Sequence, residues 1–195
     1  MEVDKPTAEK LNQMRIRPLS NIQLLGLTAL IWIGLVVYSL FSDGFYQHDE
    51  AAHYVNMLRF WFDPSVILNN WAKPGFKMVM LPFSLMGPFM LTLVNSLLAA
   101  ASGFIACKVM EKLGYENFWL PLFVLAIQPF WVQLGFRNYS EILTAFLLIS
   151  AVWGHYSGKV WLSALLLSFI LTIRQEFYPL VALYGLFLIF SKQYK

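Results

Sequence analysis

The sequence predicts an all-α, polytopic membrane protein with about six transmembrane helices and an amphipathic helix at the membrane surface. Composition is the first observation: of 195 residues, 58% are hydrophobic, 17% aromatic and only 13% charged. Soluble domains carry about 25% charged residues. The second observation is a series of uncharged runs along the chain, since about 20 apolar residues cross the hydrocarbon core as a helix. The net charge of +3 then reports membrane orientation, and no nucleic-acid partner is expected.

The first apolar run predicts a retained span at 22–41, after a polar and basic segment at 1–21. The run is too long for the core of a signal peptide, and the following "SLFSDGF" offers no small-x-small cleavage site. Residues 1–21 are therefore expected to be cytoplasmic and to precede a membrane module at 22–191.

Residues 42–77 form the sizeable outer loop of this module. Within it, "DEAAHYVNMLRFWFD" predicts an amphipathic helix, whose apolar side chains recur at helical spacing. With Trp61 at its end, this helix is expected to lie in the membrane interface. Asp49 is the expected N-cap. The apolar face consists of Ala51, Tyr54 or Val55, Leu58 and Phe62.

The later runs predict a short re-entrant or interfacial piece at 78–86 and then five spans. These are expected at 89–108, 117–136 (which contains two prolines), 142–158, 160–173 and 177–191. The last two runs are short, because 14 helical residues reach only about 21 Å. The "RQE" at 174–176 must therefore lie near the membrane boundary or in a protein-lined cavity, where charges indicate function.

The distribution of Lys and Arg favours a cytoplasmic N-terminus. Nine of the fourteen basic residues then lie inside: Lys5, Lys10, Arg15, Arg17, Lys108, Lys112, Lys159, Lys192 and Lys195. The acidic residues of interest lie outside: Asp43, Asp49, Glu50, Asp63, Glu141 and Glu176.

Asp49 and Glu50 are the first candidates for chemistry. Two adjacent carboxylates repel each other, and partial burial of one would make it a proton acceptor for a hydroxyl nucleophile. The alternative is that Asp49 only caps the helix while Glu50 is solvated.

The same stretch, "HDEAAH", resembles the HExxH pattern of zinc proteases with Asp49 in place of the first histidine. Asp49 and His53 share a helical face, whereas His48 points away, so a zinc site lacks a strong ligand. His53 could instead bind a phosphate or form an ordinary hydrogen bond at the interface.

Basic residues at the outer surface run against the positive-inside tendency. Lys73 and Lys77 in "NNWAKPGFK" fit a phosphate-bearing lipid, or else ordinary contact with lipid headgroups. The stretches "FRNYSE" at 136–141 and "IRQE" at 173–176 each put an Arg and a Glu at the outer end of a span. Three separated segments thus place acids and bases on one side of the membrane.

A first span, an outer "HDEAAHY", the "W.KPG" pattern, "RNYSE" and "TIRQE" together resemble the GT-C superfamily of membrane glycosyltransferases, from about residue 20 to 190. The resemblance implies transfer of a sugar, such as mannose, from a polyprenyl-phosphate or dolichyl-phosphate donor to a hydroxyl of a glycan, lipid or protein. It implies Asp49 as general base, supported by Glu50. The donor phosphate would contact Lys73, Arg137 and Arg174. The substrate pocket would include His48, His53, Tyr54, Glu141 and Glu176.

The resemblance also implies a periplasmic, extracellular or luminal site, membrane lipid as a partner and no fixed cofactor, with a divalent cation left as an alternative. Two departures stand out: no Pro separates His48 from Asp49, and the chain is expected to lack a soluble C-terminal domain. An intramembrane metalloprotease, a transporter and a non-catalytic scaffold are the competing interpretations. A transporter would place acids near span centres, whereas here they gather at span ends.

Overall fold

The computed structural model describes residues 19–42, 48–68 and 73–191, and every regular element in these ranges is helical. Two of the described helices are long and apolar enough to cross a membrane, α2 (Asn21–Ser39) and α5 (Pro88–Lys112). The shorter elements, in chain order, are α3 (His48–Arg59), η1 (Pro64–Leu68), α4 (Pro74–Ser84), α6 (Leu120–Ile127), α7 (Pro129–Gly135), α8 (Ser140–Tyr156), α9 (Val160–Ile170), η2 (Gln175–Phe177) and α10 (Tyr178–Phe190). The predicted all-α class is confirmed for the described residues, with two helices that could cross a membrane.

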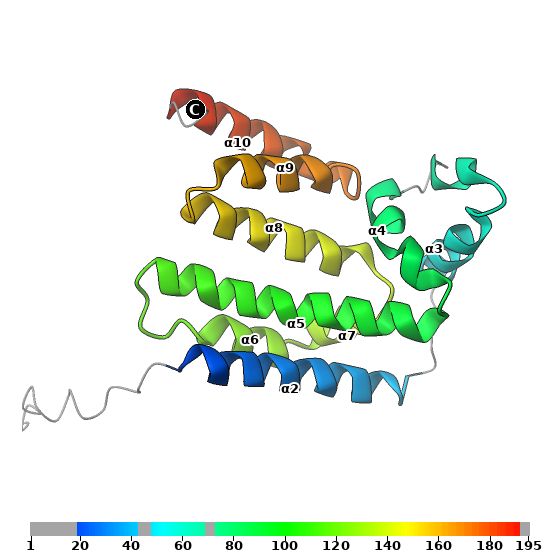
Figure 1. The fold of residues 1–195 in the computed structure, drawn as a ribbon, viewed down its shortest axis with the longest axis horizontal. Coiled ribbons are helices and arrows are strands. Elements are labelled where there is room, and N and C mark those ends of the chain that lie inside the picture. Colours follow the sequence, from blue (N-terminus) through cyan, green and yellow to red (C-terminus); the bar gives the residue numbers. More distant parts are fainter. Residues whose placement is uncertain (1–18, 43–47, 69–72, 192–195) are drawn as a thin grey trace, which may run out of the picture.

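The longer helices lie side by side in a layered, up-and-down arrangement (Figure 1). Helix α5 packs between α2 and α8, and the short α6 and α7 also contact it. Helix α9 covers α8, and α10 contacts α9. Helices α3 and α4 lie together at one end of these layers (Figure 1). The end of α2 and the starts of α5 and α8 face this same end, which we call the α3–α4 end.

Local sequence signals explain where the helices begin. Helix α2 starts with a capping box, in which the Gln23 amide N–H donates to Ser20 Oγ (3.3 Å) and the Ser20 N–H donates to Gln23 Oε1 (2.9 Å). Helices α4 and α5 start with proline, whose missing N–H costs nothing at a first helical position. Gly87, just before α5, has φ +94°, a conformation that favours glycine.

The predicted span at 117–136 is not one continuous helix, because the chain forms α6 and α7 with a break at Gln128. Pro129 cannot donate the hydrogen bond that would continue α6, and it disfavours helical backbone in the residue before it. Gln128 is accordingly extended, with ψ 113°, and its side chain caps α7 by accepting from the Trp131 N–H. The two helices together still cover most of the predicted segment.

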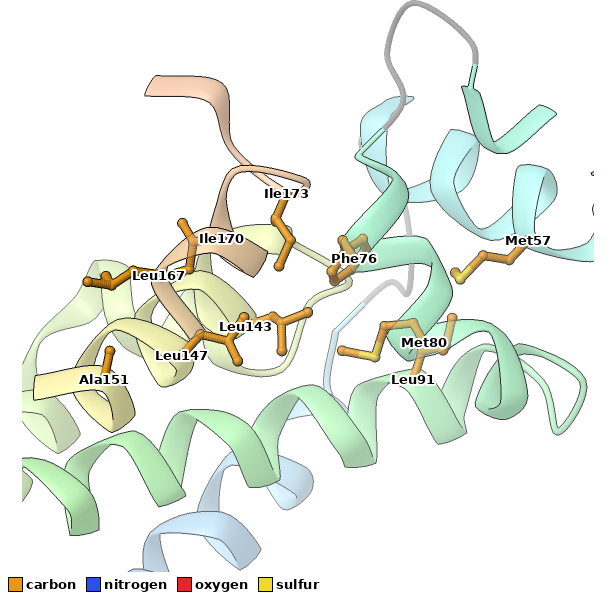
Figure 2. Close-up of a cluster of buried hydrophobic side chains, with 10 residues drawn as sticks. All are labelled: Met57, Phe76, Met80, Leu91, Leu143, Leu147, Ala151, Leu167, Ile170 and Ile173. Carbon is orange, nitrogen blue, oxygen red and sulfur yellow. The ribbon is translucent and has the colours of Figure 1, made fainter. Parts of the chain in front are cut away.

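The largest buried cluster joins the α3–α4 end to the helical layers (Figure 2). Phe76 and Met80 of α4 are fully buried and lie between Met57 of α3 and the side chains of α8 and α9. The cluster consists of Met57, Phe76, Met80, Leu91, Leu143, Leu147, Ala151, Leu167, Ile170 and Ile173. This apolar contact fixes α3 and α4 relative to the starts of α8 and η2.

Gly75 lets the start of α4 approach residues 172–173, and its replacement by alanine is expected to destabilise the protein. The Gly75 N–H donates to the Thr172 carbonyl oxygen (3.1 Å). A Cβ at this position would overlap Thr172 Oγ1 and come within 2.9 Å of Ile173 Cγ1. We expect Gly75→Ala to lower the free energy of unfolding by about 1–3 kcal/mol.

The measurement is thermal unfolding in detergent, with Gly26→Ala as the matched control. Nothing lies within 4 Å of the position that a Cβ at Gly26 would take. That variant should keep or slightly raise the melting temperature, since alanine favours helix. Equal melting temperatures for the two variants would contradict the close contact at Gly75.

Candidate functional site

The face of α3 that packs against the rest of the protein carries polar side chains. Glu50 and Met57 are fully buried and His53 is 4% exposed. Phe62, on the predicted apolar face, is 93% exposed. Helix α3 packs this polar side against α4 and residues 137–138, which supply partners for its polar groups. The expected position of its apolar face in the membrane interface stays a prediction.

Asp49 lies in the first turn of α3, which begins at His48. The prediction that Asp49 is the N-cap residue of this helix is therefore wrong. A carboxylate in a first turn still interacts favourably with the positive end of the helix dipole. Asp49 is exposed, whereas its neighbour Glu50 is completely buried. The two adjacent carboxylates therefore have different environments.

Glu50 is held by the junction between α7 and α8. Arg137 Nη1 lies 3.7 Å from Glu50 Oε2, and the Asn138 backbone N–H donates to Glu50 Oε1 (3.3 Å). The Asn138 side-chain amide also donates to the Glu50 carbonyl oxygen (3.4 Å). Arg137 and Asn138 are 6% and 0% exposed. A buried carboxylate is tolerated only when it is paired and hydrogen-bonded, and this junction supplies both kinds of partner.

A buried asparagine of α5 supports this junction in turn. Asn95 Nδ2 donates to the Leu134 carbonyl oxygen (3.0 Å) and to that of Arg137. Asn95 is fully buried within a helix that is long enough to cross a membrane. Sequence reasoning overlooked both Asn95 and Asn138. Asn95 could have been found from the sequence, because it is a side-chain amide inside an uncharged apolar run, and polar groups in such runs usually have a specific partner.

A second ion-pair group joins α8 to the segment before α10. Arg174 pairs with Glu141 in the first turn of α8 and with Glu176 of η2, the latter with Nη2 3.0 Å from Oε1. Lys73, which precedes α4, interacts electrostatically with Glu141, Glu176 and His53. Four separate segments thus bring charged groups together at the α3–α4 end.

His53 links the two groups of charges. Its ring packs edge-on against Phe76, with ring centroids 5.5 Å apart. Burial, followed by the positive charges of Lys73 and Lys77, lowers the pKa of His53 to about 4, although Asp49 and Glu141 oppose the shift. The folded protein therefore holds His53 as a neutral imidazole.

This lowered pKa predicts a loss of stability on acidification. The pKa of His53 falls from 6.5 to about 4 on folding, so between these values the unfolded chain binds more protons at this position. The His53 contribution is present above pH 6.5, is lost as the pH falls toward 4, and amounts to roughly 3 kcal/mol. The measurement is the free energy of unfolding between pH 7 and 4, wild type against His53→Gln. Parallel curves for the two proteins would contradict the prediction.

A cavity of about 410 Å³ lies on the other side of α3, at the end of α2 and the start of α5. Arg137 is the charged residue in its lining, and Tyr54 also faces it. The remaining lining residues are mostly apolar or bear hydroxyls: Ser39, Ser42, Ala51, Val55, Pro88, Phe89, Thr92 and Phe136. The cavity therefore suits an apolar group that ends near a guanidinium.

The predicted site residues divide by environment. Glu50 and Arg137 form a buried pair, and Arg174 forms ion pairs with Glu141 and Glu176. His53 and Lys73 lie between these two groups of charges. Tyr54 faces the cavity. The His48 side chain, Trp71, Asp43 and the basic residues at both chain ends lie outside the described residues. Within the described ranges, no group of three or more His, Cys, Asp and Glu side chains is placed to hold a metal ion.

No family model matches the chain, and neither a curated protein nor a solved structure matches it.

Proposed function

We propose that the protein is a GT-C-like membrane glycosyltransferase that transfers a sugar from a polyprenyl-phosphate or dolichyl-phosphate donor to a hydroxyl. The observation that carries this proposal is the contrast between two adjacent carboxylates: Asp49 is exposed, whereas Glu50 is buried and pairs with Arg137. Asp49 faces solvent on a rigidly held helix, where a general base is needed. Glu50 has its partners within the protein and supports the position of α3.

The proposed reaction is a displacement at the anomeric carbon. Asp49 accepts the proton of the acceptor hydroxyl while the oxygen forms a bond to the anomeric carbon and the bond to the lipid phosphate breaks. Lys73 and Arg174 lie among the charges at the α3–α4 end and would stabilise the negative charge that grows on the leaving phosphate. In a single step, the sugar configuration inverts.

The proposed membrane arrangement has six spans, a cytoplasmic N-terminus and the α3–α4 end outside. Its spans are α2, α5, the α6–α7 pair, α8, α9 and α10. Support comes from their side-by-side arrangement (Figure 1) and from the large apolar side chains exposed on the outermost helices. Leu30 of α2 and Leu183 of α10 are each 64% exposed, and contiguous surfaces of this kind favour contact with lipid. The cavity beside Arg137 supports a lipid-linked substrate.

The test is transfer of a labelled sugar in membranes that contain the protein. A panel of polyprenyl-phosphate and dolichyl-phosphate sugars is offered with hydroxyl acceptors, and membranes without the protein serve as the control. Transfer that depends on the lipid phosphate supports the proposal. Lack of transfer from every donor, together with stoichiometric zinc in the purified protein, would favour the metalloprotease built on His48, Asp49, Glu50 and His53.

A further inference from the structure

Lys77 occupies an unusual position for a charged residue. It is 0% exposed, in the first turns of α4, and its Nζ atom has no hydrogen-bond partner among the described residues. Burial lowers the pKa of its ammonium group below the ordinary value. Buried polar groups are nearly always paired, and an isolated buried ammonium is costly. Lys77 therefore calls for a partner that the described residues do not supply.

The surroundings of Lys77 are basic. Lys73 is the N-cap residue of α4, and Lys77 follows one turn later, with its backbone N–H donating to the Lys73 carbonyl oxygen (3.0 Å). Helical side chains tend to lean toward the start of their helix, and the start of α4 carries the positive pole of the helix dipole. His53 of α3 is close enough for both lysines to lower its pKa. Helix, lysines and imidazole together favour a negative charge at this position.

We propose that Lys77, Lys73 and His53 form a binding site for a compact oxyanion of the phosphate class. The anion accepts hydrogen bonds from Lys77 Nζ and gives the buried ammonium group a counter-charge. It also gives protonated His53 a counter-charge, in addition to Asp49 of α3 and Glu141 of α8, the acids that already act on this ring. The inference rests in part on the proposed function, since Lys73 belongs to both sites, and it adds Lys77, to which the transfer reaction gives no role.

Two consequences distinguish this site from a merely unpaired lysine. Phosphate binding should raise the pKa of His53, so that binding takes up a proton and strengthens as the pH falls from 7 toward 5. The second consequence concerns Lys77→Met, which keeps the length of the side chain but removes the buried charge. It should leave the anion-free protein at least as stable as the wild type and abolish the response to phosphate.

The experiment measures melting temperature and the His53 pKa by NMR in detergent, with three probes. They are inorganic phosphate, a short prenyl phosphate and the corresponding prenyl alcohol. Lys77→Met and Lys77→Gln are compared with Lys112→Met, which removes an exposed lysine from the far end of α5. We expect phosphate to raise the melting temperature of the wild type and of Lys112→Met by a few degrees, with at least about tenfold weaker binding in both Lys77 variants.

The probes also separate two sources of the anion. Responses to both phosphates indicate a site open to free phosphate, and a response to the prenyl phosphate alone indicates a lipid headgroup. Either result supports the site, provided that both Lys77 variants lose it. Equal responses of wild type and Lys77 variants, a response to the alcohol that matches the prenyl phosphate, or no response to any probe would overturn the proposal.

Discussion

Asp49→Asn is expected to lower the rate of sugar transfer by about 10²–10⁴-fold, which is the usual contribution of a positioned general base. The amide keeps the shape of the side chain but cannot accept the acceptor's proton. Because Asp49 is exposed, we expect its replacement to leave the melting temperature nearly unchanged. The measurement is initial transfer rate in membranes at matched protein level, combined with thermal unfolding of the purified variant.

Asp63→Asn is the control for this variant. Asp63 is also exposed and lies in the same outer loop, where its Oδ1 accepts hydrogen bonds from the Ser65 N–H and hydroxyl. It should retain transfer within about twofold of wild type, as expected of a surface change away from the site. If both variants transfer sugar at the wild-type rate, Asp49 is not the base.

Removal of the Glu50 charge is expected to have the largest effect on stability. Glu50→Leu leaves the buried Arg137 guanidinium without its carboxylate, and loss of one partner of a buried pair typically costs 3–5 kcal/mol. For a chain of this size, that loss corresponds to a fall in melting temperature of roughly 10 °C or more. Thermal or denaturant unfolding in detergent measures it directly.

The double variant Glu50→Leu with Arg137→Leu tests the physical cause. Removing both charges together avoids an uncompensated buried charge, so the double variant should be more stable than Glu50→Leu alone. Glu176→Gln, which affects an ion pair with a mostly exposed carboxylate, should change stability little. A double variant that is less stable than the single one would rule out the buried pair as the source of the effect.

The helical content of the fold was predictable from the sequence, because it depends on composition and on local signals. The predicted spans at 22–41 and 89–108 correspond to α2 and α5, the two helices long enough to cross a membrane. The break at Gln128 was missed because the length of the apolar run was given more weight than Pro129. The number of spans stays a prediction, since the shorter helices fall below the length that spans a bilayer unaided.

The site was predictable in its residue types but not in its pairings. The sequence predicted Glu50, Arg137 and Arg174 on one side of a membrane; the structure pairs Glu50 with Arg137 and Arg174 with Glu141, and the membrane side stays a prediction. It could not distinguish the buried Glu50 from the exposed Asp49, because the two are adjacent and chemically alike. The orientation of α3 decides between them, and it depends on long-range contacts with Asn138 and α4. Those partners bury the polar face of the helix, which periodicity alone did not indicate.

Asn95 has a consequence for biogenesis. In a chain that enters the bilayer during synthesis, α5 emerges from the ribosome before residues 134–137, whose carbonyl oxygens its amide binds. Until they arrive, the amide faces lipid without a partner, at a cost that grows with its depth. Insertion of α5 therefore favours rapid recruitment of α7. A chain halted between these helices would become a substrate for membrane quality control.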